Sequence, residues 1–98
     1  MTDKANVTVR DNQDKRRFEA LSESGVVAGF SQYTMRGDDI VFTHTEVDDA
    51  FEGQGVGSAL ARGALDQVRE AGKPVVAECS FIAGYIDKHP EYKDLLAS

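Results

Sequence analysis

The sequence predicts an α+β domain, in which an antiparallel meander of four strands continues into a β-loop-α-β-α unit. Three observations lead to this fold class. Residues 1–47 contain short segments of alternating or β-branched residues, separated by turn residues. Residues 56–71 place apolar side chains at helical spacing. Between the two patterns lies a glycine-rich stretch, EGQGVGSAL, at residues 52–60, which joins the strands to the helix.

The strands of the meander are expected at residues 6–11, 16–22, 26–35 and 39–47. These segments either alternate polar and apolar residues or are rich in β-branched and aromatic side chains. The links between them, DNQD, SESG and RGDD, are turn sequences. Links this short favour antiparallel pairing of neighbouring strands, because a parallel pair needs a long crossover connection.

After Val47 the pattern changes from strands to helices. Residues 48–55 are expected to form a loop, and residues 56–71 an amphipathic helix of about 24 Å at 1.5 Å per residue, which Gly72 stops. The sequence VVAEC then predicts a short strand, and SFIAGYIDKH predicts a second helix that halts before Pro90. A last helical turn is expected in EYKDLLAS.

Length and composition limit the class of protein. With 98 residues the chain is expected to form one domain over residues 1–98. A hydrophobic fraction of 41% and a charged fraction of 29% are typical of a folded globular protein. The net charge of -6 argues against nucleic-acid binding, which depends on clustered Lys and Arg.

Targeting and metal signals are also lacking in the sequence. No apolar run reaches the ~20 residues of a membrane span, and the start of the chain lacks the apolar core of a signal peptide. We therefore expect a cytoplasmic protein with no membrane partner. Cys79 is the only cysteine, which fits a reducing compartment and leaves no internal disulfide. With one thiol and two distant histidines, His44 and His89, no metal site is expected.

The glycine-rich loop predicts an anion site. A loop that opens a helix leaves backbone N–H groups unpaired at one point, and the helix dipole adds partial positive charge there. Gly53, Gly55 and Gly57 have no Cβ, so a phosphate or pyrophosphate can approach the backbone closely. The lysine of a Walker A loop is missing, and a dinucleotide fingerprint would occupy an early βαβ unit. The alternative is a glycine-rich turn without a ligand.

This loop resembles the acetyl-CoA-binding motif of the GNAT N-acetyltransferase superfamily, Gln/Arg-x-x-Gly-x-Gly/Ala. Gly55 and Gly57 match its two small positions, and Glu52 occupies its first position. HTEV at residues 44–47 and CSFIAGYIDKHPEY at residues 79–92 narrow the resemblance to the very short GNAT-like proteins. The resemblance implies a minimal GNAT-like fold.

The resemblance also implies a function, an acetyl-CoA-dependent N-acetyltransferase that acts on a small amine or a peptide amine. The alternative is a protein that binds CoA or acyl-CoA and catalyses little. In both cases the backbone of Val47 would pair with the pantetheine arm as an added strand does. We expect a monomer or a weak homodimer. The pyrophosphate would lie on Gly53, Gln54, Gly55, Val56, Gly57 and Ser58.

Three polar residues are candidates for the proton transfers. His44 and Glu46 share a face of their strand, because side chains alternate with period two. The resemblance puts Glu46 at or near the position of the general base, and the alternative is an exposed polar pair at a strand end. The resemblance makes Tyr85 the candidate general acid towards the CoA thiolate. Alternatively, Tyr85 belongs to an apolar stripe of the second helix.

Cys79 has two interpretations. It ends a strand and precedes a helix, whose N-terminus favours a thiolate, so it could take the acetyl group before the acceptor does. His44 would assist this step if the two residues lie close together in space. The alternative is a small buried hydrophobe with direct transfer to the acceptor, which is the favoured mechanism. His89 is expected to cap the second helix, with a contribution to the acceptor pocket as the alternative.

Overall fold

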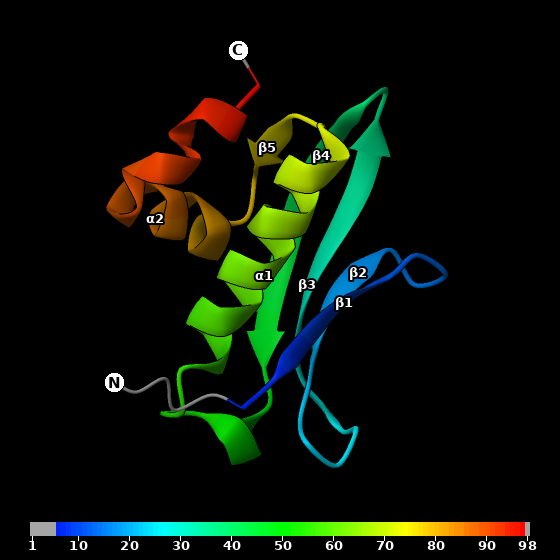
Figure 1. The fold of residues 1–98 in the computed structure, drawn as a ribbon, viewed down its shortest axis with the longest axis vertical. Helices are drawn as coiled ribbons and strands as arrows, with labels where there is room; N and C mark the ends of the chain where they lie inside the picture. Colours follow the sequence, from blue (N-terminus) through cyan, green and yellow to red (C-terminus); the bar gives the residue numbers. More distant parts are fainter. Residues whose placement is uncertain (1–5, 98) are drawn as a thin grey trace.

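The computed structural model describes residues 6–97 and confirms the α+β class (Figure 1). A five-stranded sheet has the order β1-β2-β3-β4-β5. The first four strands form the predicted antiparallel meander, and β5 joins β4 in parallel. The strands are β1 Thr8–Asn12, β2 Arg17–Leu21, β3 Val27–Arg36, β4 Asp39–Val47 and β5 Val75–Ala77.

The helices follow the predicted order. α1 spans Val56–Ala71, and α2 spans Ser80–Lys88. α1 ends as predicted at Gly72, whose positive φ of 71° and N–H bonds to the preceding turn form a C-cap. The predicted loop contains a 3-10 turn, η1 Asp49–Phe51, and the predicted last turn is a second one, η2 Pro90–Leu95. Among the described residues no helix is long and apolar enough to cross a membrane.

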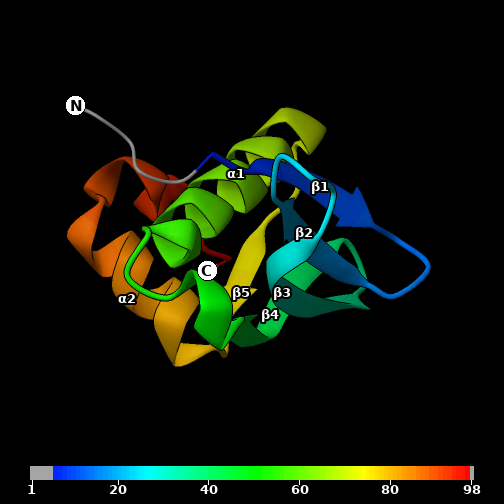
Figure 2. The ribbon, with the colours of Figure 1, turned by 90° about the horizontal axis from the view of Figure 1, so that it is seen from below.

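Both helices pack through apolar faces. α1 crosses one face of the sheet and contacts β1 to β4, whereas α2 contacts α1, β4 and β5 (Figure 2). The sheet contributes three neighbouring rings to this core, Phe18, Tyr33 and Phe42. Full burial of one such large side chain is worth about 1.5–3 kcal/mol. We call this side of the sheet the covered face. From α1 it buries Val56, Leu60, Ala61, Ala64, Leu65 and Val68.

The opposite side of the sheet, which α1 leaves uncovered, we call the open face. It is mainly polar, because most of the residues of β1 to β4 that alternate with the core residues are polar or charged. A bulge in β4 reverses the alternation of its side chains. Phe42 pairs with Tyr33 but His44 pairs with Gln32, so Thr43 is an extra residue. Beyond the bulge, His44 and Glu46 therefore lie on the open face and Thr45 on the covered face. Further open-face residues are Arg10, Asn12, Arg17, Glu19 and Phe30.

Candidate active site

β4 and β5 separate beyond their third residue pair. They pair only at residues 40–42 with 75–77 in the described part of the chain. The carbonyl of Phe42 then accepts two hydrogen bonds, from the N–H of Glu78 at 3.0 Å and of Cys79 at 2.9 Å. This shared acceptor ends β5 at Ala77, two residues before the predicted end, and turns the chain into α2. The β5-side edge of residues 43–47 is thus left open to an added strand.

The glycine loop begins α1 at the end of β4 (Figure 1). Gly53 and Gly55 have φ angles of 81° and 78°, a left-handed conformation that favours glycine. Gly57 lies close to the Phe81 ring, since a Cβ at residue 57 would lie 2.8 Å from Cζ of Phe81 and the ring would have to move. The side chain of Val56 is buried in the core, so only its backbone can face a ligand. The loop therefore presents the first-turn N–H groups of α1 at its surface.

Asp48, one of the acidic residues that precede the glycines, caps the turn before them. The Asp48 carboxylate accepts a hydrogen bond from the N–H of Ala50 at 2.9 Å, which caps η1. That contact turns one oxygen of Asp48 towards η1. The carboxylate is therefore engaged in the turn before the loop begins.

A cavity of about 250 Å³ runs along α2 beside the first turn of α1. Tyr85 forms part of its wall and stacks on His89, with ring centroids 4.0 Å apart and planes 16° apart. His89 Nδ1 donates to the carbonyl of Tyr85 at 2.8 Å, which confirms the predicted helix cap. Burial raises the pKa of Tyr85, so its hydroxyl stays protonated at neutral pH. The cavity is lined by Ser58, Ser80, Phe81, Gly84, Tyr85, Lys88 and His89.

Cys79 lies on the covered face, with an exposed fraction of 6%. Its Sγ is 3.3 Å from Oγ1 of Thr45, which in turn is 2.9 Å from Oγ of the fully buried Ser31. On β4 the thiol therefore contacts Thr45. The expected proximity of His44 to Cys79 is wrong, because His44 lies on the opposite face of the sheet. The reason is the alternation of β4, which points Thr45 inward and His44 outward.

His44 and Glu46 share the open face, as the alternation predicted. His44 Nε2 donates to Glu46 Oε2 at 2.6 Å, and both side chains are more than half exposed. Beside Glu46 is a pocket of about 200 Å³, which sequence reasoning missed. Its wall is formed by β2, β3 and the end of β4. The pocket could not be predicted without knowing how these strands pair. The lining residues are Arg17, Val27, Gly29, Phe30, Glu46 and Asp48.

A buried carboxylate organises the open face next to this pocket. The Glu19 side chain is 1% exposed, and it accepts hydrogen bonds from Arg17 Nε at 2.8 Å, Arg10 Nη2 at 3.0 Å and Asn12 Nδ2 at 3.1 Å. Burial alone would raise the pKa of Glu19, but these donors outweigh it and hold the pKa below its ordinary value. The Arg17 guanidinium also lies 4.5 Å above the Phe30 ring. Arg17 is thereby fixed from two sides.

The structure shows a splayed strand pair, a glycine loop at a helix N-terminus and a polar pair on β4, and the sequence predicted the last two. A family model described as GCN5-related N-acetyl-transferase matches residues 17–95. The chain belongs to the GCN5-related N-acetyltransferase (GNAT) family. It carries a GNAT N-acetyltransferase domain, and the resemblance of the sequence to this superfamily is confirmed.

Relatives and solved structures agree with the GNAT assignment. The chain is 31% identical to mouse Protein NATD1 over 85 residues, which covers 86% of this chain and 77% of the mouse protein. It is 40% identical to human Protein NATD1 over 47 residues, which covers 48% of this chain and 42% of the human protein. NATD1 is N-acetyltransferase domain-containing protein 1, the type of the very short subgroup that the sequence resembles.

Two solved structures share the GNAT fold. A GCN5-like protein from Staphylococcus aureus superposes with a TM-score of 0.70 at 24% identity, over 95% of this chain and 90% of that one. A protein named for phosphinothricin N-acetyltransferase superposes with a TM-score of 0.56 at 25% identity, over 74% of this chain and 50% of that one. The minimal GNAT-like fold is therefore confirmed.

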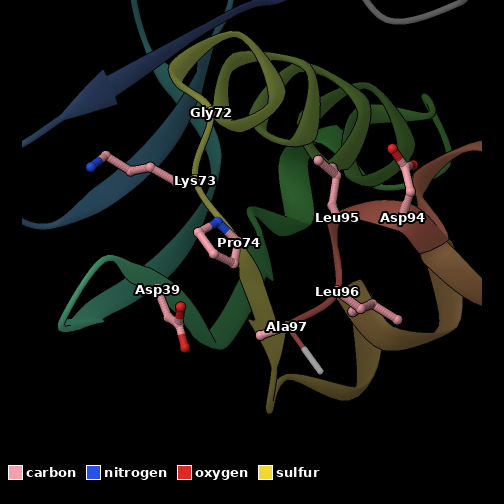
Figure 3. A pocket seen from close by; sticks show the side chains of 8 residues that line it. All are labelled: Asp39, Gly72, Lys73, Pro74, Asp94, Leu95, Leu96 and Ala97. Atoms are coloured by element: carbon pink, nitrogen blue, oxygen red, sulfur yellow. The ribbon is translucent and has the colours of Figure 1, made fainter.

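A larger surface depression lies away from the GNAT motif. It measures about 540 Å³ and is formed by the turn after α1, the start of β4 and the C-terminal residues (Figure 3). Gly72, the C-cap of α1, lines it, whereas the glycine loop begins α1 at the opposite end of the helix. Its lining residues include none of the predicted site residues. The depression is lined by Asp39, Gly72, Lys73, Pro74, Asp94, Leu95, Leu96 and Ala97.

Proposed function

We propose that this GNAT domain binds acetyl-CoA and transfers its acetyl group directly to an amine. The observation that carries the proposal is the separation of β4 from β5 beyond Phe42, at the end of the sheet where α1 begins. The pantetheine arm would add to the free edge of β4 near Val47, and the pyrophosphate would lie on the N–H groups of residues 53–58. The cavity beside Phe81 would then receive the rest of the coenzyme.

In this mechanism the open face supplies the proton acceptor. The amine nitrogen attacks the thioester carbonyl, the C–S bond breaks, and the acetyl group becomes an amide. Glu46 takes the proton that the amine loses, and the CoA thiolate leaves with a proton from Tyr85 or from water. Burial raises the pKa of Tyr85, so its hydroxyl carries a proton when the thiolate forms, although it is a weaker acid than an ordinary tyrosine. The burial of Cys79 at 6% exposure supports direct transfer over a two-step route through its thiol.

Calorimetric titration with acetyl-CoA tests the binding step. Gly55→Glu should abolish saturable binding, because it adds a side chain and a negative charge at the loop. Gly37→Glu is the matched control, since Gly37 also has a positive φ, of 63°, with open space at its Cβ, but lies in the turn between β3 and β4. Equal loss of binding in both variants would contradict a phosphate site at the loop.

Glu46→Gln tests the chemical step. Loss of a general base should lower kcat by roughly 10²–10⁴ with the affinity for acetyl-CoA intact. A protein that binds acetyl-CoA and releases no CoA with any amine would instead be the coenzyme-binding alternative. Intact mass analysis after incubation with acetyl-CoA decides the route, since an added acetyl group that Cys79→Ala removes would favour the two-step mechanism.

A further inference from the structure

The pocket beside Glu46 holds charges of both signs. Glu46 supplies a carboxylate and Arg17 a guanidinium, and both line the same cavity of about 200 Å³. A ligand that fits inside it is therefore small, with charged groups close together.

Arg17 is held ready to bind an anion. It donates to Glu19 through Nε, the guanidinium nitrogen nearest the chain, so this ion pair does not need the two Nη atoms. Its Cζ lies 4.5 Å above the Phe30 ring, which restricts rotation of the side chain. A guanidinium fixed in this way loses little conformational freedom when it binds a carboxylate in bidentate fashion.

The charges around Arg17 are of both signs. Glu19 is shared between Arg10 and Arg17, so one buried carboxylate faces two guanidinium groups. Asp48, the second acid of the pocket, has an oxygen engaged by the N–H of Ala50. The pocket thus places one guanidinium beside two exposed carboxylates, Glu46 and Asp48. A zwitterion can pair with both signs of this pattern, whereas a simple cationic amine can pair only with the carboxylates.

We infer that the acceptor of this domain is a free α-amino acid, with its carboxylate bound by Arg17 and its amine at Glu46, an inference that rests on the proposed function. The α-carboxylate then acts as a handle that presents the amine to the base. Arg17 is a binding residue in this arrangement, and Glu19 is a positioning residue that acts through it. Substitution of Arg17 should therefore affect acceptors that carry a carboxylate and spare those that do not.

The test compares amino acids with their decarboxylated counterparts: alanine with ethylamine, leucine with isoamylamine, and phenylalanine with phenethylamine. CoA release at saturating acetyl-CoA gives kcat/KM for each acceptor. The wild-type protein should prefer at least one amino acid over its matched amine by about tenfold or more. Arg17→Gln should lower that amino acid's kcat/KM by roughly 10–100-fold, the effect of one charged hydrogen-bond pair, and change the matched amine by less than about twofold.

Two further variants protect the test from a folding defect. Arg17→Lys keeps the charge but loses the bidentate geometry, so its value for the amino acid should be intermediate. Arg36→Gln is the matched control, because Arg36 lies on β3 and pairs with the exposed Glu78 outside the pocket. It removes the same charge and should leave the preference unchanged. A preference for the amines, or an equal fall for both members of a pair in Arg17→Gln, overturns the inference.

Binding without coenzyme separates this inference from the proposed function. Alanine or leucine added to the protein should shift the amide NMR signals of Gly29, Phe30 and Glu46, and Arg17→Gln should abolish the shifts. If these shifts occur in a protein that does not bind acetyl-CoA, the proposed function fails and the amino-acid site stands. If acetyl-CoA binds but no amino acid shifts these signals or is acetylated, the inference is wrong and the proposed function stands.

Discussion

The two faces of the sheet carry buried polar groups of different kinds. On the covered face, Thr45 links two neutral partners, the buried Ser31 hydroxyl and the Cys79 thiol. On the open face, the buried group is a carboxylate, Glu19, which three donor side chains surround. A neutral hydroxyl can be buried with one or two hydrogen bonds, whereas an ionised group needs opposite charge as well. The helices thus pack against polar groups that require no counter-charge.

This difference separates the two proposed routes of acetyl transfer. Direct transfer needs Glu46 on the open face, and the two-step route needs Cys79 on the covered face. The bulge at Thr43 puts Glu46 and Cys79 on opposite faces of the sheet. Without it, regular alternation from Phe42 would turn the Glu46 side chain towards the covered face. Substitutions on one face should therefore leave the other face intact, provided that they do not share partners.

The largest effect on stability is expected on the open face. Glu19→Gln should lower the free energy of unfolding by about 2 kcal/mol, less than a fully buried pair because Arg10 is 56% exposed. The two arginines would lose their counter-charge while the shape of the side chain is kept. Urea unfolding measures the change. Glu70→Gln on the exposed side of α1 is the control and should stay within about 0.5 kcal/mol.

The contribution of ionised Glu19 to stability should also depend on pH. Since the pKa of Glu19 is lower in the folded protein than its ordinary value of 4.5, its ionised form stabilises the fold above that pH. This contribution should be lost as the pH falls from 4.5 through the folded pKa. The difference in stability between wild type and Glu19→Gln should therefore shrink over that range. A constant difference down to acid pH would show that the charge is not its source.

The elements with the strongest local signals were predicted best. The bounds of α1, residues 56–71, agree at both ends because the glycine loop and Gly72 mark them. Strand β4, residues 39–47, also agrees. The last strand was predicted two residues too long, because its end depends on a tertiary contact, the shared carbonyl of Phe42.

The candidate site was only partly predictable for a related reason. Alternation placed His44 and Glu46 on one face, and it could also have identified Thr45 on the other face beside Cys79. It could not say which face was covered, since the bulge at Thr43 leaves no mark in the sequence. Arg17 and Phe30 meet Glu46 only through the pairing of three strands, so no local pattern reveals them.

The covered face should show a smaller effect. Thr45→Val removes the hydroxyl that joins Ser31 and Cys79 and leaves the buried Ser31 without this partner. We expect a loss of about 1 kcal/mol in the free energy of unfolding. Thr45→Ser keeps the hydroxyl and should recover part of that loss. With direct transfer, kcat should change little in both variants, so a large fall in kcat with Thr45→Val alone would favour a role for the thiol.

The smallest effect is expected for His44. Its hydrogen bond to Glu46 joins two exposed side chains, and such surface pairs contribute about 0–1 kcal/mol. His44→Gln should therefore change the free energy of unfolding by less than about 0.5 kcal/mol, within the range of ordinary surface substitutions. If His44 only orients the Glu46 carboxylate, kcat should fall by a few fold while Glu46→Gln costs far more. Steady-state kinetics of both variants make the comparison. An equal loss in the two would show that His44 and Glu46 act as one proton-accepting unit, because residues that act together give non-additive losses.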